Sequence, residues 1–251
     1  MRKSILGLSA IALLSAISTP ALAQDEAAAE PIKITGSAGL VSDYRFRGVS
    51  QSGQNVAVQA GITATHESGF YVGTWGSSIN FAGNAEVDIF GGWSGAVTEG
   101  VTVDVGLLYY LYPKHGGGDT NFFEPYVNVI GAIGPVTLKV GANYAWSQDA
   151  LGNLKTGTGT ADAIYLHTES SFTVPGTPFG LNGHLGYASS SAFPGSPGDF
   201  TYRDGEVLDW SVGATATWKS LTFGVSYVDT DEPGQIRGAD AAVVFSLTAA
   251  F

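Results

Sequence analysis

Along most of this chain apolar and polar residues alternate with a period of two, and this alternation limits the folds that the chain can adopt. In residues 101–111 and 136–146 every second residue is apolar, as in the series Val103, Val105 and Leu107. Successive side chains of a β-strand point to opposite faces, so the pattern predicts strands with one apolar face. Each run is about 11 residues long, which suits a tilted strand that crosses a bilayer.

Twelve such segments are predicted, with short and longer connections in alternation. The other ten are residues 34–47, 56–64, 70–79 (whose phase the sequence does not assign), 87–93, 123–133, 163–172, 179–189, 208–218, 221–229 and 241–251. The brief connections are 66–69, 95–100, 134–135, 174–178 and 219–220, and the longer ones include 113–121, 148–162, 190–207 and 230–238, with 49–55 the shortest of that set. Outer-membrane barrels alternate short periplasmic turns with longer external loops. We therefore expect the N-terminus in the periplasm and leave strand counts from about ten to about fourteen open.

The predicted sheet should close into a barrel, because a bilayer core offers no water to unpaired backbone groups. The composition fits, with 35 glycines, 12% aromatic residues and only 13% charged residues, where soluble domains have about 25%. Aromatic residues typical of membrane interfaces lie near strand ends, namely Trp93, Tyr109, Trp146, Trp210 and Trp218. We expect a single, closed, antiparallel, all-β transmembrane barrel. The alternative is a soluble β-sandwich or lipocalin-like barrel with its apolar faces inward.

The N-terminal segment predicts export. Residues 1–23 combine Arg2 and Lys3, an apolar run and a small-residue site at Ala23, the pattern of a cleaved signal peptide. Polar, Ala-rich residues 24–32 are expected to form a flexible periplasmic lead, which leaves 33–251 for the barrel. Loss of the leader removes two of the 11 basic residues and none of the 22 acidic ones. So acidic a chain argues against nucleic-acid binding, and the lack of cysteine excludes thiolate catalysis and thiolate metal sites.

The C-terminal strand and the first part of the predicted barrel carry two resemblances. The alternating series that ends at Phe251 resembles the signal that the outer-membrane assembly machinery recognises. Residues 36–79, GSAGLVSDYRFRGVSQSGQNVAVQAGITATHESGFYVGTWGSSI, and residues 86–93, EVDIFGGW, are similar to the TorF-type porin family of proteobacteria. These resemblances imply an outer-membrane barrel surrounded by lipid and lipopolysaccharide. They supply no catalytic or substrate residues.

If the apolar face meets lipid, the opposite face lines the lumen. The predicted pore-lining residues are Asp43, Arg45, Arg47, Glu86, Asp88, Asp104, Glu124, Lys139 and Asp209. Glu169 and Asp240 share this phase, so acids outnumber bases. We expect Arg45 and Arg47, on the first strand, to face carboxylates across a narrow lumen and so to set a field that filters solutes. The alternative is that these charges pair to hold a filled interior together.

These features predict passive diffusion of small polar or ionic solutes, with small conductance and a mild preference for cations. Twelve strands fall between filled barrels of about eight strands and open porins of about sixteen. The alternative is a non-conducting receptor, adhesin or structural barrel that acts through its external loops. Acids expected in those loops, which would meet solvent or divalent cations, are Asp149, Asp199, Asp204, Asp229, Asp231 and Glu232. The solute and the oligomeric state are left open.

No catalytic, cofactor-binding or metal-binding residues are predicted. A lipid-modifying barrel enzyme would need Ser and His in contact, and His167, Glu169 and Ser171 do share one strand face. Neighbours on one strand face are about 7 Å apart, too far for a hydrogen-bonded triad. His66 and His115 fall beside a turn and in a Gly-rich loop, and the spacing of the four histidines is not that of a metal site.

Overall fold

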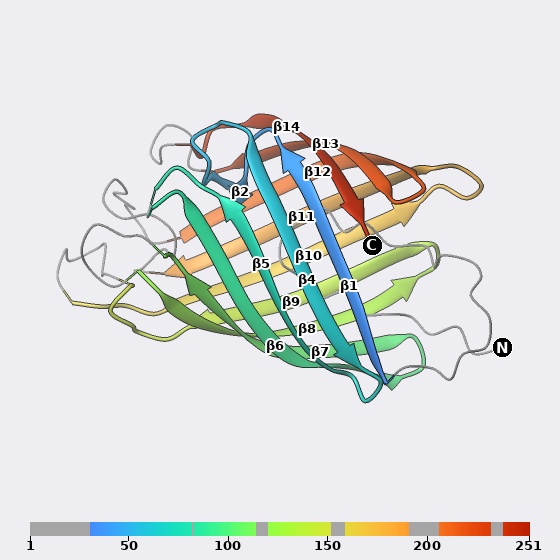
Figure 1. Cartoon of the computed structure of the whole chain (residues 1–251), viewed down its shortest axis with the longest axis horizontal. Coiled ribbons are helices and arrows are strands. Elements are labelled where there is room, and N and C mark those ends of the chain that lie inside the picture. The colour runs from blue at the N-terminus through green and yellow to red at the C-terminus, as the bar shows by residue number, and fades with distance from the viewer. Residues whose placement is uncertain (1–30, 82, 114–119, 152–158, 191–205, 232–237) are drawn as a thin grey trace.

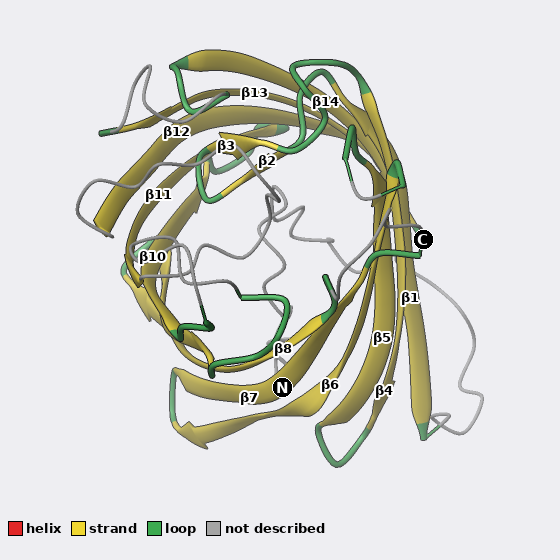
Figure 2. Cartoon of the chain, turned by 90° about the vertical axis from the view of Figure 1, so that its left-hand side faces the viewer, coloured by secondary structure: helices red, strands yellow, loops and turns green. Residues whose placement is uncertain are grey.

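The computed structural model describes residues 31–81, 83–113, 120–151, 159–190, 206–231 and 238–251. In this part of the chain twelve antiparallel strands close into one barrel, with β1 and β14 side by side at the seam (Figure 1 and Figure 2). Over the same residues, no helix is long and apolar enough to cross a membrane. The predicted fold class, a closed all-β barrel of twelve strands, is confirmed.

Apart from the first, each barrel strand lies where a segment was predicted. The strands are β1 (Ile32–Val41), β4 (Ala57–His66), β5 (Phe70–Ser78), β6 (Ala85–Thr98), β7 (Val101–Leu111), β8 (Phe122–Ile133), β9 (Val136–Ala145), β10 (Ala163–Thr173), β11 (Phe179–Ser190), β12 (Glu206–Trp218), β13 (Leu221–Thr230) and β14 (Ala242–Ala250). The barrel begins at Ile32, one residue before its predicted start. The predicted signal peptide, residues 1–23, and residues 24–30 of the predicted lead lie outside the described residues.

Five short turns gather at one end of the barrel, on the right-hand side of Figure 1. They join β4 to β5, β6 to β7, β8 to β9, β10 to β11 and β12 to β13, and their residues with positive φ are Gly69, Gly100, Gly134, Gly176 and Lys219. The second turn is shorter than predicted, because β6 continues through a bulge at Ala96 and Thr98. Longer connections lie at the other end, so the predicted alternation of connection lengths is present.

The two faces of the wall differ as the alternation requires. On β7, Val105 and Leu107 are 40% and 43% exposed, whereas Asp104 and Leu108 are 1% and 7% exposed. Apolar side chains therefore cover the outside of the barrel, and polar and aromatic side chains line its inside. In the segment whose phase was not predicted, the buried residues are Tyr71, Trp75, Ser77 and Ile79.

The first predicted strand is wrong beyond Val41. β1 ends there, and the chain turns into the barrel, where β2 (Arg45–Phe46) and β3 (Val49–Ser50) form a two-stranded hairpin (Figure 2). The hairpin is also extended chain with a period of two. The sequence pattern therefore does not change at the bend, and the predicted strand continued past it. Tyr44 and Phe46, expected to face lipid, instead pack inside the barrel. The connection predicted at residues 49–55 extends over 42–56 and contains this hairpin.

Candidate functional site

The β2–β3 hairpin reverses direction in a tight turn against the barrel wall. Arg47 and Gly48, the two central residues, both have positive φ, 49° and 81°. Positive φ at both positions is the signature of a type I′ turn, whose twist matches that of the paired strands. A Cβ atom at Gly48 would overlap the Thr230 side chain on β13. Glycine therefore lets the turn lie directly against the wall.

Asp43 holds the hairpin together from within. Its carboxylate accepts hydrogen bonds from Arg45 Nε, at 2.8 Å, and from the Ser50 hydroxyl, at 2.6 Å. Arg45 also donates to the carbonyl oxygens of Gly48 and Asp240, at 2.9 and 2.7 Å. The prediction that Arg45 faces carboxylates across the lumen is therefore wrong, because the turn brings it back beside Asp43.

Arg47 reaches from the hairpin to the far wall. Its Nη2 donates to both carboxylate oxygens of Glu124 on β8, at 2.8 and 2.9 Å. The guanidinium also lies over the rings of Phe46 and Tyr165, 4.6 and 4.1 Å from their centroids. Burial alone would lower the pKa of Arg47, but the Glu124 carboxylate raises it above its ordinary value, so the side chain stays charged. Arg47 thus meets a carboxylate across the lumen, although from a hairpin and not from the first strand.

Tyrosine hydroxyls bind the acids of the β6–β8 wall. Glu86 accepts hydrogen bonds from Tyr44 and Tyr112, at 2.7 and 2.9 Å. Two more acids are bound by a tyrosine and an asparagine each: Glu124 by Tyr110 and Asn143, and Asp104 by Tyr71 and Asn128. Asp88, also on β6, is an exception, because its buried Oδ1 accepts no hydrogen bond from the described residues.

The β9–β12 wall carries ion pairs and histidines. Lys139 pairs with Glu169 at 2.7 Å. Asp209 accepts a hydrogen bond from the Tyr165 hydroxyl at 2.9 Å and lies 2.9 Å from His184 Nε2. His167 is 8% exposed and lies inside the barrel, with its Nδ1 3.6 Å from Glu169 Oε1. Within the described part of the chain, no hydrogen bond joins His167 to Ser171, and no three His, Asp or Glu side chains are grouped to hold a metal ion.

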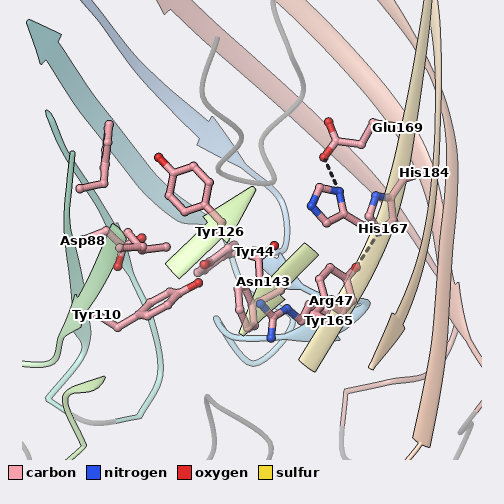
Figure 3. A pocket seen from close by; sticks show the side chains of 13 residues that line it. Tyr44, Arg47, Asp88, Tyr110, Tyr126, Asn143, Tyr165, His167, Glu169 and His184 are labelled. Atoms are coloured by element: carbon pink, nitrogen blue, oxygen red, sulfur yellow. Dashed lines mark hydrogen bonds and ion pairs between the residues drawn. The ribbon is translucent and has the colours of Figure 1, made fainter. Parts of the chain in front are cut away.

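Two cavities flank Arg47 inside the lumen. The first, of about 50 Å³, lies between the hairpin and strands β6 to β11 (Figure 3). The second, of about 160 Å³, lies between the hairpin and strands β10 to β14, β1 and β4. One water molecule needs about 10–15 Å³ of such cavity volume, so the second cavity has room for several water molecules. The residues that line both cavities are Tyr44, Arg47, Tyr165, Glu169 and His184.

Comparison with known proteins assigns the chain to a family. A family model of bacterial proteins of unknown function, Gcw_chp, matches residues 25–251. The chain belongs to the Gcw_chp family. The comparison with curated proteins gives no significant match.

Solved structures similar to this Gcw_chp protein include two porins. A NanC porin is 12% identical, with a TM-score of 0.56, over 87% of this chain and 98% of its own. A KdgM porin is 8% identical, with a TM-score of 0.54, over 87% of this chain and 97% of its own. Another KdgM structure, equally similar, is a complex with disordered oligogalacturonate. Identities this low establish a shared fold only.

The sequence located most of the buried charges of this Gcw_chp barrel but not their partners. The predicted pore-lining residues that lie on the inner face of barrel strands are Glu86, Asp88, Asp104, Glu124, Lys139 and Asp209. Asp240, which was predicted to share this phase, is not on the inner face of a strand. It is exposed and lies just before β14. Asp229, expected in a loop, lies on β13. Of the other predicted residues, His115, Asp199, Asp204 and Glu232 fall outside the described part of the chain.

Two groups of residues in the Gcw_chp lumen were missed at the sequence level. The tyrosines that bind the acids share the inward phase of those acids, and that phase could have revealed Tyr110 and Tyr165. Tyr71 lies in the segment whose phase the sequence does not assign, so it could not have been found in this way. The β2–β3 turn was also missed, and Gly48, directly after the alternating segment, was its signal in the sequence.

Proposed function

We propose that this Gcw_chp protein is an outer-membrane channel for the passive diffusion of small polar or ionic solutes. The observation that carries the proposal is the side-chain distribution across the wall, which is apolar outside and charged or hydroxyl-bearing inside. A closed barrel with these faces leaves no backbone edge in hydrocarbon and encloses a polar path. The fold shared with the NanC and KdgM porins supports this function, as does the similarity of residues 36–79 to TorF-type porins.

The hairpin limits the size of the solute. It places Arg47 across the lumen in an ion pair with Glu124, and the two cavities described above lie on either side of Arg47. We therefore expect a small conductance and passage of small solutes only.

The charges of the lumen favour cations. We assign the pore-lining role to the predicted set, namely Asp43, Arg45, Arg47, Glu86, Asp88, Asp104, Glu124, Lys139 and Asp209. Acids outnumber bases in this set, and charged side chains that line a pore select ions of the opposite sign. Oligogalacturonate, present in one KdgM structure, is a polyanion, and the acidic excess here argues against that class of solute.

The location and the partners belong to the same proposal. Residues 1–23 would direct export, and the strand that ends at Phe251 would be recognised by the assembly machinery of the outer membrane. Lipid and lipopolysaccharide would then surround the apolar band. The proposal includes no catalytic step, cofactor or metal.

Recordings in planar bilayers test the channel directly. Purified protein, refolded in detergent, is expected to give a small conductance and a reversal potential of cationic sign in a KCl gradient. Absence of current, or anion selectivity, would contradict the proposal. A barrel whose lumen is closed by the hairpin, acting as a receptor or adhesin through its loops, would give neither current nor swelling of liposomes.

A further inference from the structure

One carboxylate in the lumen lacks the partners that its neighbours have. Asp88 is 1% exposed, and its Oδ1 accepts no hydrogen bond from the described residues. Glu86, two residues away on the same face, is bound by two tyrosine hydroxyls, and Glu124 is bound by Arg47. A buried charge without a partner is costly. Asp88 is therefore suited to a positively charged partner from outside the chain.

Aromatic side chains surround Asp88. The strand register places Trp75 on β5 and Tyr110 on β7 directly beside it, and all three face inward. Phe90 is the next inward residue on β6. Two rings of the β1–β2 segment pack edge-on against this wall, with Tyr44 5.4 Å from Trp75 and Phe46 5.9 Å from Tyr110, measured between centroids.

The carboxylate and these rings share a cavity. Asp88 lines the smaller cavity together with Tyr44, Phe46, Phe90 and Tyr110, and Figure 3 shows Asp88, Tyr44 and Tyr110 among its lining side chains. The cation on this cavity, Arg47, is already bound to Glu124. Asp88 is therefore left without a lysine or arginine partner among the residues that line this cavity.

One carboxylate among aromatic rings favours an organic cation over a metal ion. No three acidic or histidine side chains of the described residues are grouped to hold a metal ion. Aromatic faces, by contrast, attract organic ammonium ions through the ring quadrupole, and more strongly where water is excluded. A single carboxylate adds a charge partner for the nitrogen.

We infer that Asp88, Tyr44, Phe46, Phe90 and Tyr110 form a binding site for a small organic ammonium ion. The ammonium nitrogen lies against the Asp88 carboxylate, and its carbon substituents contact the rings. This ammonium site names a class of solute for the proposed channel. The ammonium site depends on the proposed channel function in one respect: the organic cation must be able to enter the lumen.

Calorimetric titration with choline chloride tests the site on the full barrel, folded in detergent. Saturable binding is expected for choline. No binding is expected for 3,3-dimethylbutan-1-ol, which has the same shape without the charge. Asp88→Asn should weaken choline binding about tenfold or more, and Phe90→Leu should weaken it severalfold.

Asp104→Asn is the matched control, because it removes the same charge from a buried carboxylate that lines neither cavity. It should leave choline affinity within about twofold. Folding of each variant is checked by the change in gel mobility on boiling. As a second measurement, choline should raise the unfolding temperature of the wild type and of Asp104→Asn, but not that of Asp88→Asn.

The ammonium site is overturned if the folded wild type binds no choline, binds the alcohol equally well, or keeps its affinity in Asp88→Asn. Bilayer recordings separate this result from the channel proposal. Choline binding without any current would leave the ammonium site standing and remove the channel. A cation-selective current without choline binding would do the reverse.

Discussion

Arg47 has two roles that favour different side chains, one in the backbone turn and one in an ion pair. It occupies the first central position of a type I′ turn, where Asn, Asp or Gly is favoured, and a non-glycine residue there costs about 1–2 kcal/mol. It also forms the ion pair with Glu124 across the lumen, which none of those shorter side chains could reach. The ion pair and the ring contacts offset the backbone strain.

Replacement of Arg47 by Asn separates these two roles. Asn-Gly is favoured in this turn, so Arg47→Asn should keep the hairpin while leaving Glu124 buried without its cation. We expect a loss of about 3–5 kcal/mol in the free energy of unfolding, because one partner of a buried pair is removed. We also expect a larger conductance and a stronger preference for cations, measured by urea titration in vesicles and by bilayer recording.

The double variant Arg47→Asn/Glu124→Gln serves as the control for this pair. It removes both charges, so most of the lost stability should return while the conductance stays high. Equal stability of the single variant and the wild type would show that the ion pair does not fasten the hairpin to β8.

At the scale of elements, the position of the hairpin depends on close approach of its turn to the β12–β13 wall. Gly48 and Gly100 both have positive φ, 81° and 77°, but only at Gly48 would a Cβ atom meet neighbouring atoms. Alanine at either position carries the same backbone cost, about 1 kcal/mol. Gly48→Ala must in addition move the hairpin away from Thr230.

We therefore expect Gly48→Ala to destabilise the protein by about 1–3 kcal/mol more than Gly100→Ala, as small-to-large changes in packed sites do. Hydrogen exchange should report faster exchange of the Ser50 amide, which donates to the Gly238 carbonyl, in Gly48→Ala only. Identical behaviour of the two alanine variants would mean that the turn does not rest on the wall.

The hairpin also shows how far the sequence predicts this fold. A spanning strand is recognised by its period and length, and both hold for segments such as 101–111 and 136–146. A hairpin folded into the lumen has the same period, so Tyr44 and Arg45 were placed on the wall. The rings that lie beside Asp88, Trp75 on β5 and Tyr110 on β7, depend on the register of these strands with β6, which alternation does not determine.

At the scale of the whole molecule, the apolar exterior gives a test of which solvent surrounds the barrel. Leu107, in the middle of β7, is 43% exposed, whereas Phe179 begins β11 beside a short turn. Leu107→Arg should destabilise the barrel in lipid vesicles by about 2–4 kcal/mol. Phe179→Arg, near the interface, should cost only about 0–1 kcal/mol. Equal and negligible costs at both positions would mean that no lipid contacts the band.

The seam of the barrel is uneven. β1 pairs with β4 from Ile32 to Val41, but with β14 only from Ser37 to Val41, and the terminal Phe251 extends this ladder no further than Gly36. Among the described residues, Ile32–Thr35 therefore pair with β4 on one side and have no strand neighbour on the other. In the bilayer proposed above, backbone groups left unpaired here would have to lie outside the hydrocarbon, within reach of water or headgroup oxygens. The gap in the ladder would then set how far the turn end of the cylinder protrudes from that bilayer.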